Sequence, residues 1–486
     1  MAASRATVQA PPQAAAARSA AVTLGIILAC QLMIGLDVTI VNVALPKIQE
    51  SLHFSAVGQS WVLNSYALAF GGLVLLGGRA GDILGRRRVF LAGIALFAVA
   101  SLAGGSAPQG WELIIARAVQ GAAAAFAAPS ALALLMVNFP DQERRTRALA
   151  LYSIVTALGT SAGLILGGVL VSWASWRWVL FVNVPVAVVV LVLTPRFVRT
   201  MPANAGRFDA GGAVTSTAGM ALLIFGSVHG ATNGWGGWPT IAALAGGAVL
   251  LCLFFFIETH VSQPVTPLWL FRDANRAGGY AIIFLVMAAL YSLYFFGTQF
   301  MEDVLAYSPL RTGLSFLVTT LAAVVAARAT ARLLPHFGAR ATLVAAATLT
   351  LAGSIWMTQL SASSSYLAGL AGPLLLFGLG IGLSVPALNV TILAGIQPRD
   401  SGAASGLLQA MQFTGGTIGL ALLVAIYGTA LERPMRGASE LAAAHSIVAH
   451  GIATAYIAGA LMTGAALVVA ALVVRKRVAP APAAAE

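Results

Sequence analysis

Two charged residues, Asp37 and Arg117, lie in stretches that are otherwise apolar and long enough to cross a bilayer. An ionised side chain at mid-membrane costs about 2.5 to 3.5 kcal/mol, so such residues are kept where they bind an ion, relay a proton or pair with another charge. Because this cost falls on the charged form, Asp37 could gain and lose a proton near neutral pH. We therefore expect a proton site in which Arg117 holds the carboxylate charged until a proton releases it. The alternative is a static buried ion pair that only fixes helix packing.

The polar residues of the first predicted helix divide into two faces. At about 100° per residue, Gln31, Val38 and Asn42 share one face, and Asp37 lies roughly 140° from Asn42. We expect the amide face to line a central cavity and Asp37 to point towards a neighbouring helix of the same bundle. The candidate cavity residues are Gln31, Asn42, Trp61, Asn64, Tyr66, Tyr291, Tyr294, Gln299, Asn389, Gln409, Gln412 and Phe413. An apolar pocket with few polar anchors suits bulky amphipathic or cationic molecules, although a helix–helix hydrogen bond would explain any single one.

The elements that must position these residues are transmembrane helices. Hydrophobic residues make up 59% of the 486-residue chain and charged residues only 9%, against about 25% charge in soluble domains. Apolar runs of about 20 residues, the length that spans a bilayer, predict an all-α membrane protein with fourteen helices. They are expected near residues 20–45, 57–77, 88–107, 112–138, 147–171, 177–195, 209–229, 239–257, 278–300, 311–334, 340–360, 366–395, 403–430 and 447–474.

The basic residues follow a pattern across the predicted loops. The chain has a net charge of +12 and 27 Lys and Arg residues. We assign 21 of them to the termini and the even-numbered gaps between helices, five to the opposite side, and Arg117 to a helix interior. By the positive-inside rule both ends of the chain lie in the cytoplasm. The basicity therefore reports topology and attraction to anionic membrane lipid, and not nucleic-acid binding.

The predicted helices divide into six, two and six. Basic, proline-containing segments at 194–207 and 264–276 bracket the seventh and eighth helices. In transporters built from two bundles, the substrate site lies near the midplane between them, and the bundles rock to give alternating access. The predicted units are a disordered cytoplasmic tail at 1–19, a six-helix bundle at 20–195, a linker with two extra helices and an interfacial segment at 196–276, a second six-helix bundle at 277–478 and a disordered tail at 479–486.

Glycines recur at helical spacing in two of the predicted helices. The fifth helix carries Gly159, Gly163, Gly167 and Gly168, and the thirteenth has glycines at 402, 406, 415 and 419. Small residues on one face let helix backbones approach closely. We expect these seams to be tight where the bundles close on either side, and ordinary packing without gating is the alternative.

No cluster of residues suggests an enzyme. Cys30 and Cys252 fall inside apolar helices, and no metal-ligand spacing is present. The six histidines fall mostly in loops and at helix ends, without a catalytic grouping. The sequence contains no phosphate-binding loop. We therefore expect no catalytic site, no metal and no cofactor, and transport driven by a proton gradient.

The turn between the second and third predicted helices reads Gly-Arg-Ala-Gly-Asp-Ile-Leu-Gly-Arg-Arg-Arg over residues 78–88. It resembles the loop signature of the major facilitator superfamily, with alanine at position 80 where a leucine is usual. We expect the aspartate to accept the free amide hydrogens of a helix N-terminus, and the arginines to pair with acids of the next cytoplasmic loop as a conformational latch. A charged topological anchor is the alternative. The latch would consist of Gly78, Asp82, Gly85, Arg86, Arg87, Asp141 and Glu143.

Three further motifs resemble those of the drug:proton antiporter-2 branch of that superfamily, the fourteen-helix multidrug efflux type. They are Leu-Asp-Val-Thr-Ile-Val-Asn-Val-Ala-Leu-Pro at 36–46, Arg-Ala-Val-Gln-Gly at 117–121 and Trp-Arg-Trp-Val-Leu-Phe-Val-Asn-Val-Pro at 176–185. With Tyr-Ser-Pro-Leu at 307–310, the resemblance covers nearly the whole chain. In the fifth helix Leu164 stands where the branch has a proline, which favours a straighter helix and leaves the coupling mode open.

The resemblance implies a proton-coupled antiporter that exports hydrophobic or amphipathic compounds such as drugs by alternating access, and so confers antibiotic resistance. A dedicated exporter of a lipid, siderophore or self-made metabolite is the first alternative, and a non-transporting receptor or scaffold is the second. A scaffold would not need Asp37, Arg117 and the Asp82 loop together, so transport is preferred. We expect a monomeric, multi-pass protein of the bacterial cytoplasmic membrane. Its partners would be protons, membrane lipid and a hydrophobic small-molecule or lipid-like substrate.

Overall fold

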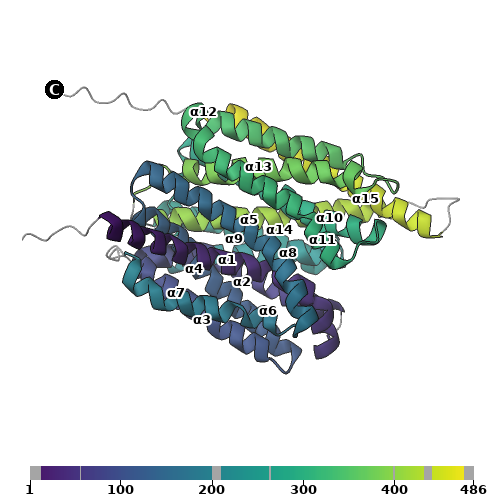
Figure 1. The fold of residues 1–486 in the computed structure, drawn as a ribbon, viewed down its shortest axis with the longest axis horizontal. Helices are drawn as coiled ribbons and strands as arrows, with labels where there is room; N and C mark the ends of the chain where they lie inside the picture. The colour runs from purple at the N-terminus through teal and green to yellow at the C-terminus, as the bar shows by residue number, and fades with distance from the viewer. Residues whose placement is uncertain are drawn as a thin grey trace, which may run out of the picture.

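The computed structural model describes residues 13–54, 56–199, 209–261, 264–397, 400–431 and 440–475. Every regular element in these ranges is helical, and the long helices run side by side along the long axis of the molecule (Figure 1). The predicted all-α membrane fold is therefore confirmed.

The first bundle occupies the lower half of the view in Figure 1. It begins earlier than predicted, because the alanine-rich stretch from Gln13 already forms helix, as alanine favours. The remainder of the predicted tail at 1–19, and the tail at 479–486, lie outside the described residues. The elements are α1 (Gln13–Leu52), α2 (Ala56–Leu84), α3 (Arg86–Ser106), α4 (Gly110–Asn138), α5 (Gln142–Trp173), α6 (Trp178–Phe181) and α7 (Asn183–Phe197).

The second bundle occupies the upper half of the same view (Figure 1). It is preceded by the short helix η1 (Leu268–Phe271), which forms part of the predicted interfacial segment. The elements of the bundle are α10 (Ala274–Gln299), η2 (Phe300–Val304), α11 (Pro309–Ser315), α12 (Leu317–Met357), η3 (Tyr366–Ala371), α13 (Gly372–Leu393), α14 (Ser401–Leu431) and α15 (Glu440–Leu472).

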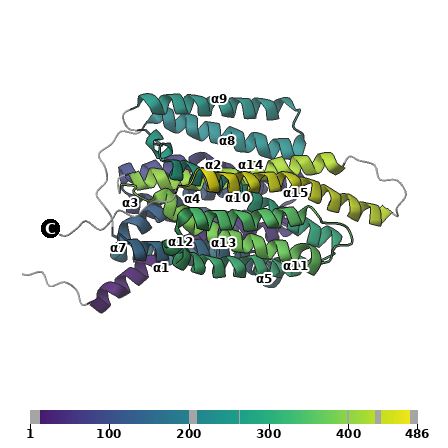
Figure 2. The ribbon, with the colours of Figure 1, turned by 90° about the horizontal axis from the view of Figure 1, so that it is seen from above.

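Two helices lie outside both bundles. α8 (Ala210–Asn233) and α9 (Trp238–His260) pack on each other as a hairpin. Figure 2 shows the hairpin along one edge of the molecule, with α8 against α2 and α14. The hairpin therefore covers the place where α2 of the first bundle meets α14 of the second.

Twelve helices of the described chain are long and apolar enough to cross a membrane. The predicted tenth and eleventh helices are joined in α12, but Gly338 has φ 78° and ψ 169°, so the backbone leaves helical geometry between two arms. The predicted fifth helix is present as a continuous α5 but is not one of these twelve. The count of fourteen membrane spans stays a prediction.

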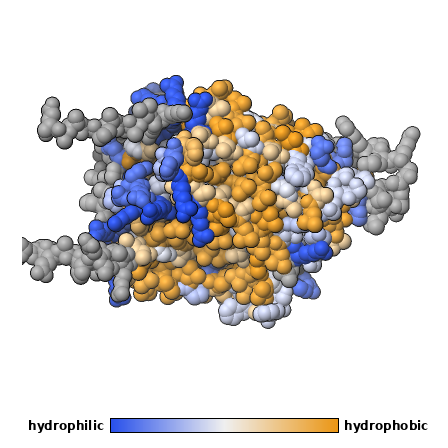
Figure 3. All heavy atoms as spheres, turned by 45° about the horizontal axis from the view of Figure 1, so that its top comes forward, coloured by the Kyte–Doolittle hydropathy of each residue, from blue (hydrophilic) through white to orange (hydrophobic). Residues whose placement is uncertain are grey.

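Apolar side chains cover the middle of the molecule. Figure 3 shows a broad hydrophobic band, with hydrophilic side chains gathered mainly towards the end at which α1 begins. We call this the inner end, because the distribution of charge predicts that it is cytoplasmic. Among the apolar residues, Val99, Val214 and Leu461 are 62%, 66% and 71% exposed. Soluble proteins rarely expose apolar patches of this extent, so the band is the surface that lipid covers.

The glycines of α5 pack within the first bundle. A side chain at Gly167 would lie 2.9 Å from Ile40 O of α1, and the other two glycines that lie against α1 in this way are Gly159 and Gly163. This seam is internal packing and not a closing surface between bundles, which corrects the gating interpretation for α5. The prediction that Gly168 lies in a tight helix contact is also wrong, because a side chain there would meet nothing within 4 Å.

Gly85 forms the turn between α2 and α3 and has φ 95°. We predict that Gly85→Ala lowers the melting temperature of the detergent-solubilised protein, because a non-glycine residue in such a conformation costs about 1 to 3 kcal/mol. Gly25→Ala is the matched control, since a side chain there meets nothing within 4 Å and alanine favours the helix. Equal melting temperatures for the two variants would contradict the prediction.

Candidate functional site

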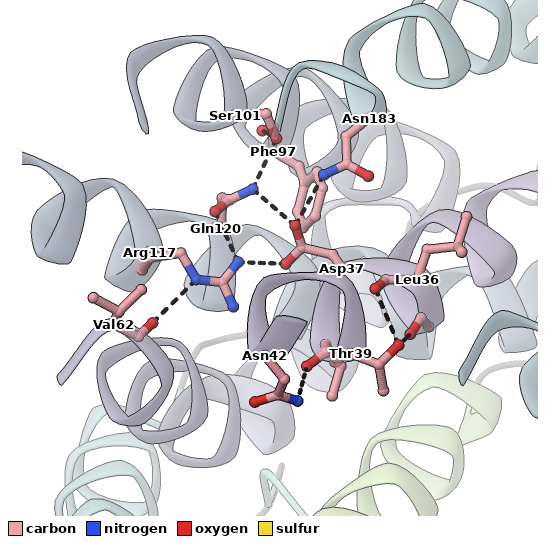
Figure 4. Close-up of polar contacts among 12 residues, drawn as sticks. Leu36, Asp37, Thr39, Asn42, Val62, Phe97, Ser101, Arg117, Gln120 and Asn183 are labelled. Atoms are coloured by element: carbon pink, nitrogen blue, oxygen red, sulfur yellow. Dashed lines mark hydrogen bonds and ion pairs between the residues drawn. The ribbon is translucent and has the colours of Figure 1, made fainter. Parts of the chain in front are cut away.

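The carboxylate of Asp37 is the centre of a buried polar cluster in the first bundle. Its side chain is completely buried, and it lies in the half of α1 away from the inner end. Arg117 Nη1 of α4 donates to Asp37 Oδ2 at 2.5 Å. The other oxygen, Oδ1, accepts from Asn183 Nδ2 of α7 at 2.9 Å and from Gln120 Nε2 of α4 at 3.2 Å (Figure 4). The carboxylate therefore receives three donors from two neighbouring helices.

The guanidinium of Arg117 is held by more than its ion pair. Its Nη1 also donates to Gln120 Oε1 at 3.0 Å, and its Nε donates to Val62 O of α2 at 3.2 Å (Figure 4). The guanidinium carbon lies 4.5 Å from the centre of the Tyr66 ring of α2, within the range of a cation–π interaction. Arg117 would consequently keep three of its contacts if the Asp37 carboxylate were neutralised.

Gln120 connects the pair to a third neighbouring helix. Its Nε2 donates to Ser101 Oγ of α3 at 2.8 Å, and Ser101 Oγ donates to Phe97 O one turn earlier (Figure 4). All these groups are buried, and a buried polar network is stable only when its members are satisfied. Such an arrangement can hold a charged carboxylate, because one cation and two amides donate to its oxygens.

A row of aromatic rings runs from this cluster to the second bundle. Tyr66 stacks on Phe70 of α2 with ring centres 6.1 Å apart, and Phe70 packs on Phe413 of α14 at 5.0 Å. The backbone of Tyr66 is held as well, because a side chain at Gly121 of α4 would collide with Tyr66 O. Arg117 is therefore linked through packed rings to the contact between the two bundles.

A second site joins the bundles at the inner end. Asp82 of α2 accepts hydrogen bonds from Gly402 N at 3.0 Å and from Ala403 N at 2.9 Å. These are first-turn amides of α14, which have no partner within their own helix. Arg86 Nη2 donates to the same carboxylate at 2.8 Å. Asp82 does accept amide hydrogens at a helix N-terminus, as expected, and the helix belongs to the other bundle.

Glycine permits this approach. A side chain at Gly78 would lie 2.5 Å from Gly402 O and 3.0 Å from Gly406 Cα. The close seam expected for the glycines at 402 and 406 therefore lies between bundles, whereas Gly415 and Gly419 pack on α10 within the second bundle.

The structure contradicts the prediction that Asp141 and Glu143 are the acidic partners of the latch. Asp141 Oδ2 instead caps α5 by accepting from Arg144 N at 3.0 Å, and Glu143 pairs with Arg147 at 2.5 Å. Arg87 Nη1 donates to two backbone carbonyls at the end of α7. Both acids find a partner within one turn of α5, and Arg87 finds its acceptors at the end of α7 in the same bundle. Neither acid therefore forms a described ion pair with the arginines at 86–88.

Three of the predicted cavity residues form a bridge between the bundles. Tyr152 Oη of α5 donates to Gln31 Oε1 of α1 at 2.5 Å and accepts from Gln409 Nε2 of α14 at 3.3 Å. Asn389 Nδ2 of α13 donates to Ser153 Oγ of α5 at 3.3 Å. Together with the Asp82 contacts, these hydrogen bonds hold the described parts of the two bundles together in their inner halves.

The other predicted cavity residues do not form one lining. Trp61 stacks on Phe225 of α8 at 6.2 Å, so it faces the hairpin and not the centre. Tyr294 packs on Phe316 at 5.0 Å inside the second bundle. Asn42 is exposed, and its Nδ2 donates to the backbone of α1. The half-buried members of the set are Asn64, Tyr291, Gln299 and Gln412.

Sequence reasoning missed four polar partners of these sites. Gln120 and Asn183 stand in the sequence analysis only as parts of motifs, although each is an amide side chain within an apolar helix. Ser101 and Tyr152 carry no comparable signal, because serine and tyrosine are ordinary in membrane helices. Helical spacing gives the direction of Asp37 within α1, but it does not say which residue of another helix lies opposite.

Comparison with known proteins supplies independent information. Residues 27–213 and 207–420 match the family model described as Major Facilitator Superfamily. The chain is 39% identical over 419 residues to the cephamycin export protein CmcT of Amycolatopsis lactamdurans, covering 85% of this chain and 86% of that protein. It is 39% identical over 407 residues to the puromycin resistance protein pur8 of Streptomyces alboniger, covering 82% and 80%.

A third relative is the tetracenomycin C resistance and export protein of Streptomyces glaucescens, 33% identical over 81% of this chain and 73% of that protein. Among solved structures, the human organic anion transporter MFSD10 superimposes with a TM-score of 0.62 at 16% identity, covering 94% of this chain and all of that one. At this identity the likeness concerns the fold alone.

Removing one partner of the buried ion pair should be more damaging than removing both. We predict that Arg117→Met destabilises the protein by about 3 to 5 kcal/mol, because it leaves an uncompensated buried charge. Adding Asp37→Asn should restore part of the loss, measured as the melting temperature in detergent. Arg177→Met is the control, since Arg177 donates to the carbonyls of Gly105 and Ala107 and to no described carboxylate. If Asp37→Asn rescues neither variant, the ion pair does not carry the stability assigned to it.

Proposed function

This chain belongs to the major facilitator superfamily, and from that premise we propose that it is a proton-coupled exporter of hydrophobic or amphipathic compounds. The observation that carries the proposal is the buried Asp37 and Arg117 pair, which is linked by packed rings to the contact between two bundles. A purely structural pair would need no such link. Transport requires that ion binding in one bundle alters the contact between both.

The proposed cycle uses the inter-bundle contacts as the closed inner gate. Substrate would enter when the bundles part at the inner end and would leave when they part at the opposite end. Protonation of Asp37 would break its ion pair with Arg117. The guanidinium would keep its contacts with Val62 O, Gln120 Oε1 and the Tyr66 ring. Movement of that guanidinium would then shift the aromatic row that reaches α14.

The relatives support the substrate class. Three of them bear names that refer to export of, or resistance to, cephamycin, puromycin and tetracenomycin C. These names and the largely apolar interior favour a drug-like organic compound for this chain. A dedicated exporter of one self-made metabolite is the second candidate, because each of the three names refers to a single compound.

The multi-pass character of the chain follows from its apolar spans. We place it in the bacterial cytoplasmic membrane with both termini inside. Support for this orientation comes from the basic residues at the inner end and from the return of the chain, since Arg475 N after α15 donates to Asn275 Oδ1 at the inner start of α10. A proton moving inward through about 100 mV would release about 2.3 kcal/mol.

Neutralising Asp37 should abolish coupled export. We predict that an efflux-deficient bacterium expressing Asp37→Asn accumulates a panel of drugs to the level of cells without the transporter, because the amide can no longer exchange a proton. The control is Glu50→Gln on the same helix, where an exposed glutamate pairs with Lys47. That variant should export like the unmodified protein.

Two outcomes would revise this proposal. Undiminished, gradient-dependent export by well-expressed Asp37→Asn would exclude the proton role of Asp37. If no drug in the panel responds to the unmodified protein but a metabolite made by its own host does, the dedicated exporter would replace the multidrug exporter.

The bridge at Tyr152 should bias the inner gate. We predict that Tyr152→Phe raises the ratio of inner-open to inner-closed molecules about 2- to 10-fold, since a hydrogen bond contributes about 0.5 to 1.5 kcal/mol. Spin labels at the inner ends of α2 and α14 would report this distance distribution in a cysteine-free background. Tyr366→Phe is the control, because Tyr366 Oη donates to Ser315 O within the second bundle. An identical distribution for both variants would contradict the prediction.

A further inference from the structure

Another group of buried charges lies at the inner root of the α8–α9 hairpin, outside the two sites described above. Asp209 precedes α8, and Glu258 lies in the last turns of α9. Their side chains belong to residues that are 9% and 4% exposed. Arg79 of α2 is the basic residue that interacts electrostatically with Glu258. Two carboxyl groups therefore lie where the hairpin contacts the first bundle, and the charge of Arg79 acts on one of them from α2.

Each carboxyl group is anchored to backbone through one oxygen only. Glu258 Oε1 accepts from Val265 N at 3.0 Å and from Thr266 N at 3.2 Å, which fixes the segment after α9. Asp209 Oδ1 accepts from Gly212 N at 2.8 Å and so caps α8. Within the described chain, the second oxygens, Asp209 Oδ2 and Glu258 Oε2, are buried without a hydrogen-bond partner.

The two groups are close to each other. A side chain at Gly212 would collide with Asp209 Oδ2 and would lie 3.1 Å from Glu258 Oε1, so both carboxyl groups border the same small space. Thr266 Oγ1, which belongs to a residue 2% exposed, is also buried there without a described partner. The absence of a side chain at Gly212 is what allows the two acids to approach.

Two carboxylates that share a buried space cannot both ionise cheaply, because like charges repel strongly where water is excluded. One proton bound by the pair would remove one of the two charges and give one carboxyl group an O–H donor in the space that both groups border. The remaining negative charge would then be balanced by Arg79, whose Nε is itself buried without a described acceptor. We propose that Asp209 and Glu258 form a carboxyl pair that binds one proton and, with Arg79, makes a second proton site at the root of the hairpin.

Among the residues that the structure describes, the other elements packed here add no further titratable group to the site. His260 is the exposed last residue of α9, and its ring packs at a tilt against Phe256. The segment that donates to Glu258 does so through backbone amides. Of the described charged groups, Asp209 and Arg79 are the ones whose charges act on Glu258, alongside the larger effect of its burial.

The position of Arg79 connects this site to the contact between the two bundles at the inner end. Arg79 lies directly after Gly78, which contacts α14, and three residues before Asp82, which caps α14. Loss of the shared proton would add a negative charge beside Arg79 and draw the inner end of α2 towards the hairpin. The hairpin would thereby sense the cytoplasmic proton concentration at the inner gate. Only this last step rests on the proposed export function, and the shared proton does not.

The test is infrared spectroscopy of the purified full-length protein, in which protonated carboxyl groups have a carbonyl band separate from that of carboxylates. We expect the unmodified protein to show one such carboxyl equivalent at neutral pH, and Glu258→Gln or Asp209→Asn each to remove it. Both variants keep the backbone contacts, because the glutamine oxygen can accept from the same amides and asparagine also caps helices. Asp37→Asn and Glu50→Gln should leave the band unchanged.

A third variant tests the role of the guanidinium. Arg79→Met should move the loss of the band to higher pH, because the pair then lacks the cation that favours its ionised form. No protonated band at neutral pH, or a band of equal area in the unmodified protein and both carboxyl variants, would overturn the shared proton. Since this readout requires no transport, it stands apart from the Asp37 export experiment, whose failure would overturn the proposed function alone.

Discussion

The structure depends on the requirement that a charge buried among apolar helices must be paired. Asp37 meets this requirement with one cation and two amides, which come from α4 and α7. Arg117 in turn uses a backbone carbonyl of α2, so four helices of one bundle are oriented by a single carboxylate. An ion pair of this kind contributes little net stability compared with a well-packed apolar core, but losing one partner is expensive. Under the proposed function, its value to the protein lies in the two states that a proton on Asp37 would select.

Asp82 at the inner end is also a buried charge that must be paired, but its partners come from both bundles. Asp82 has Arg86 as its cation and the first amides of α14 as its donors, so its charge is shared between the two bundles. The approach that this sharing needs is supplied by glycines on both helices. Asp37 therefore stabilises one bundle internally, whereas Asp82 stabilises a particular arrangement of both. The aromatic row from Tyr66 to Phe413 is the described physical connection between the two regions.

Much of this arrangement could be predicted from the sequence, and the limits have identifiable causes. Apolar length located the helices, and the cost of burial singled out Asp37 and Arg117. The partners Gln120 and Asn183 depend on which helices are neighbours, a property of the packed bundle that no single helix determines. Loop proximity predicts that Asp141 and Glu143 pair with the latch arginines, but capping and i,i+4 pairing keep both acids within α5. The sequence does not predict that the tenth and eleventh helices meet directly at Gly338, because a glycine can either end a helix or allow the chain to turn into a second one.

The magnitudes of these contacts constrain how the transporter could work. Hydrogen bonds to charged groups contribute about 1.5 to 3 kcal/mol and neutral ones about 0.5 to 1.5 kcal/mol. Two bonds to Asp82 and the Tyr152 and Asn389 bonds between bundles thus hold the inner gate by several kcal/mol. One proton crossing about 100 mV supplies only about 2.3 kcal/mol. In the proposed cycle, the membrane potential acting on one proton at Asp37 therefore supplies less free energy than these contacts hold. The remainder would come from a pH difference, from tighter binding of substrate to the open state, or from a further charge acting on α2.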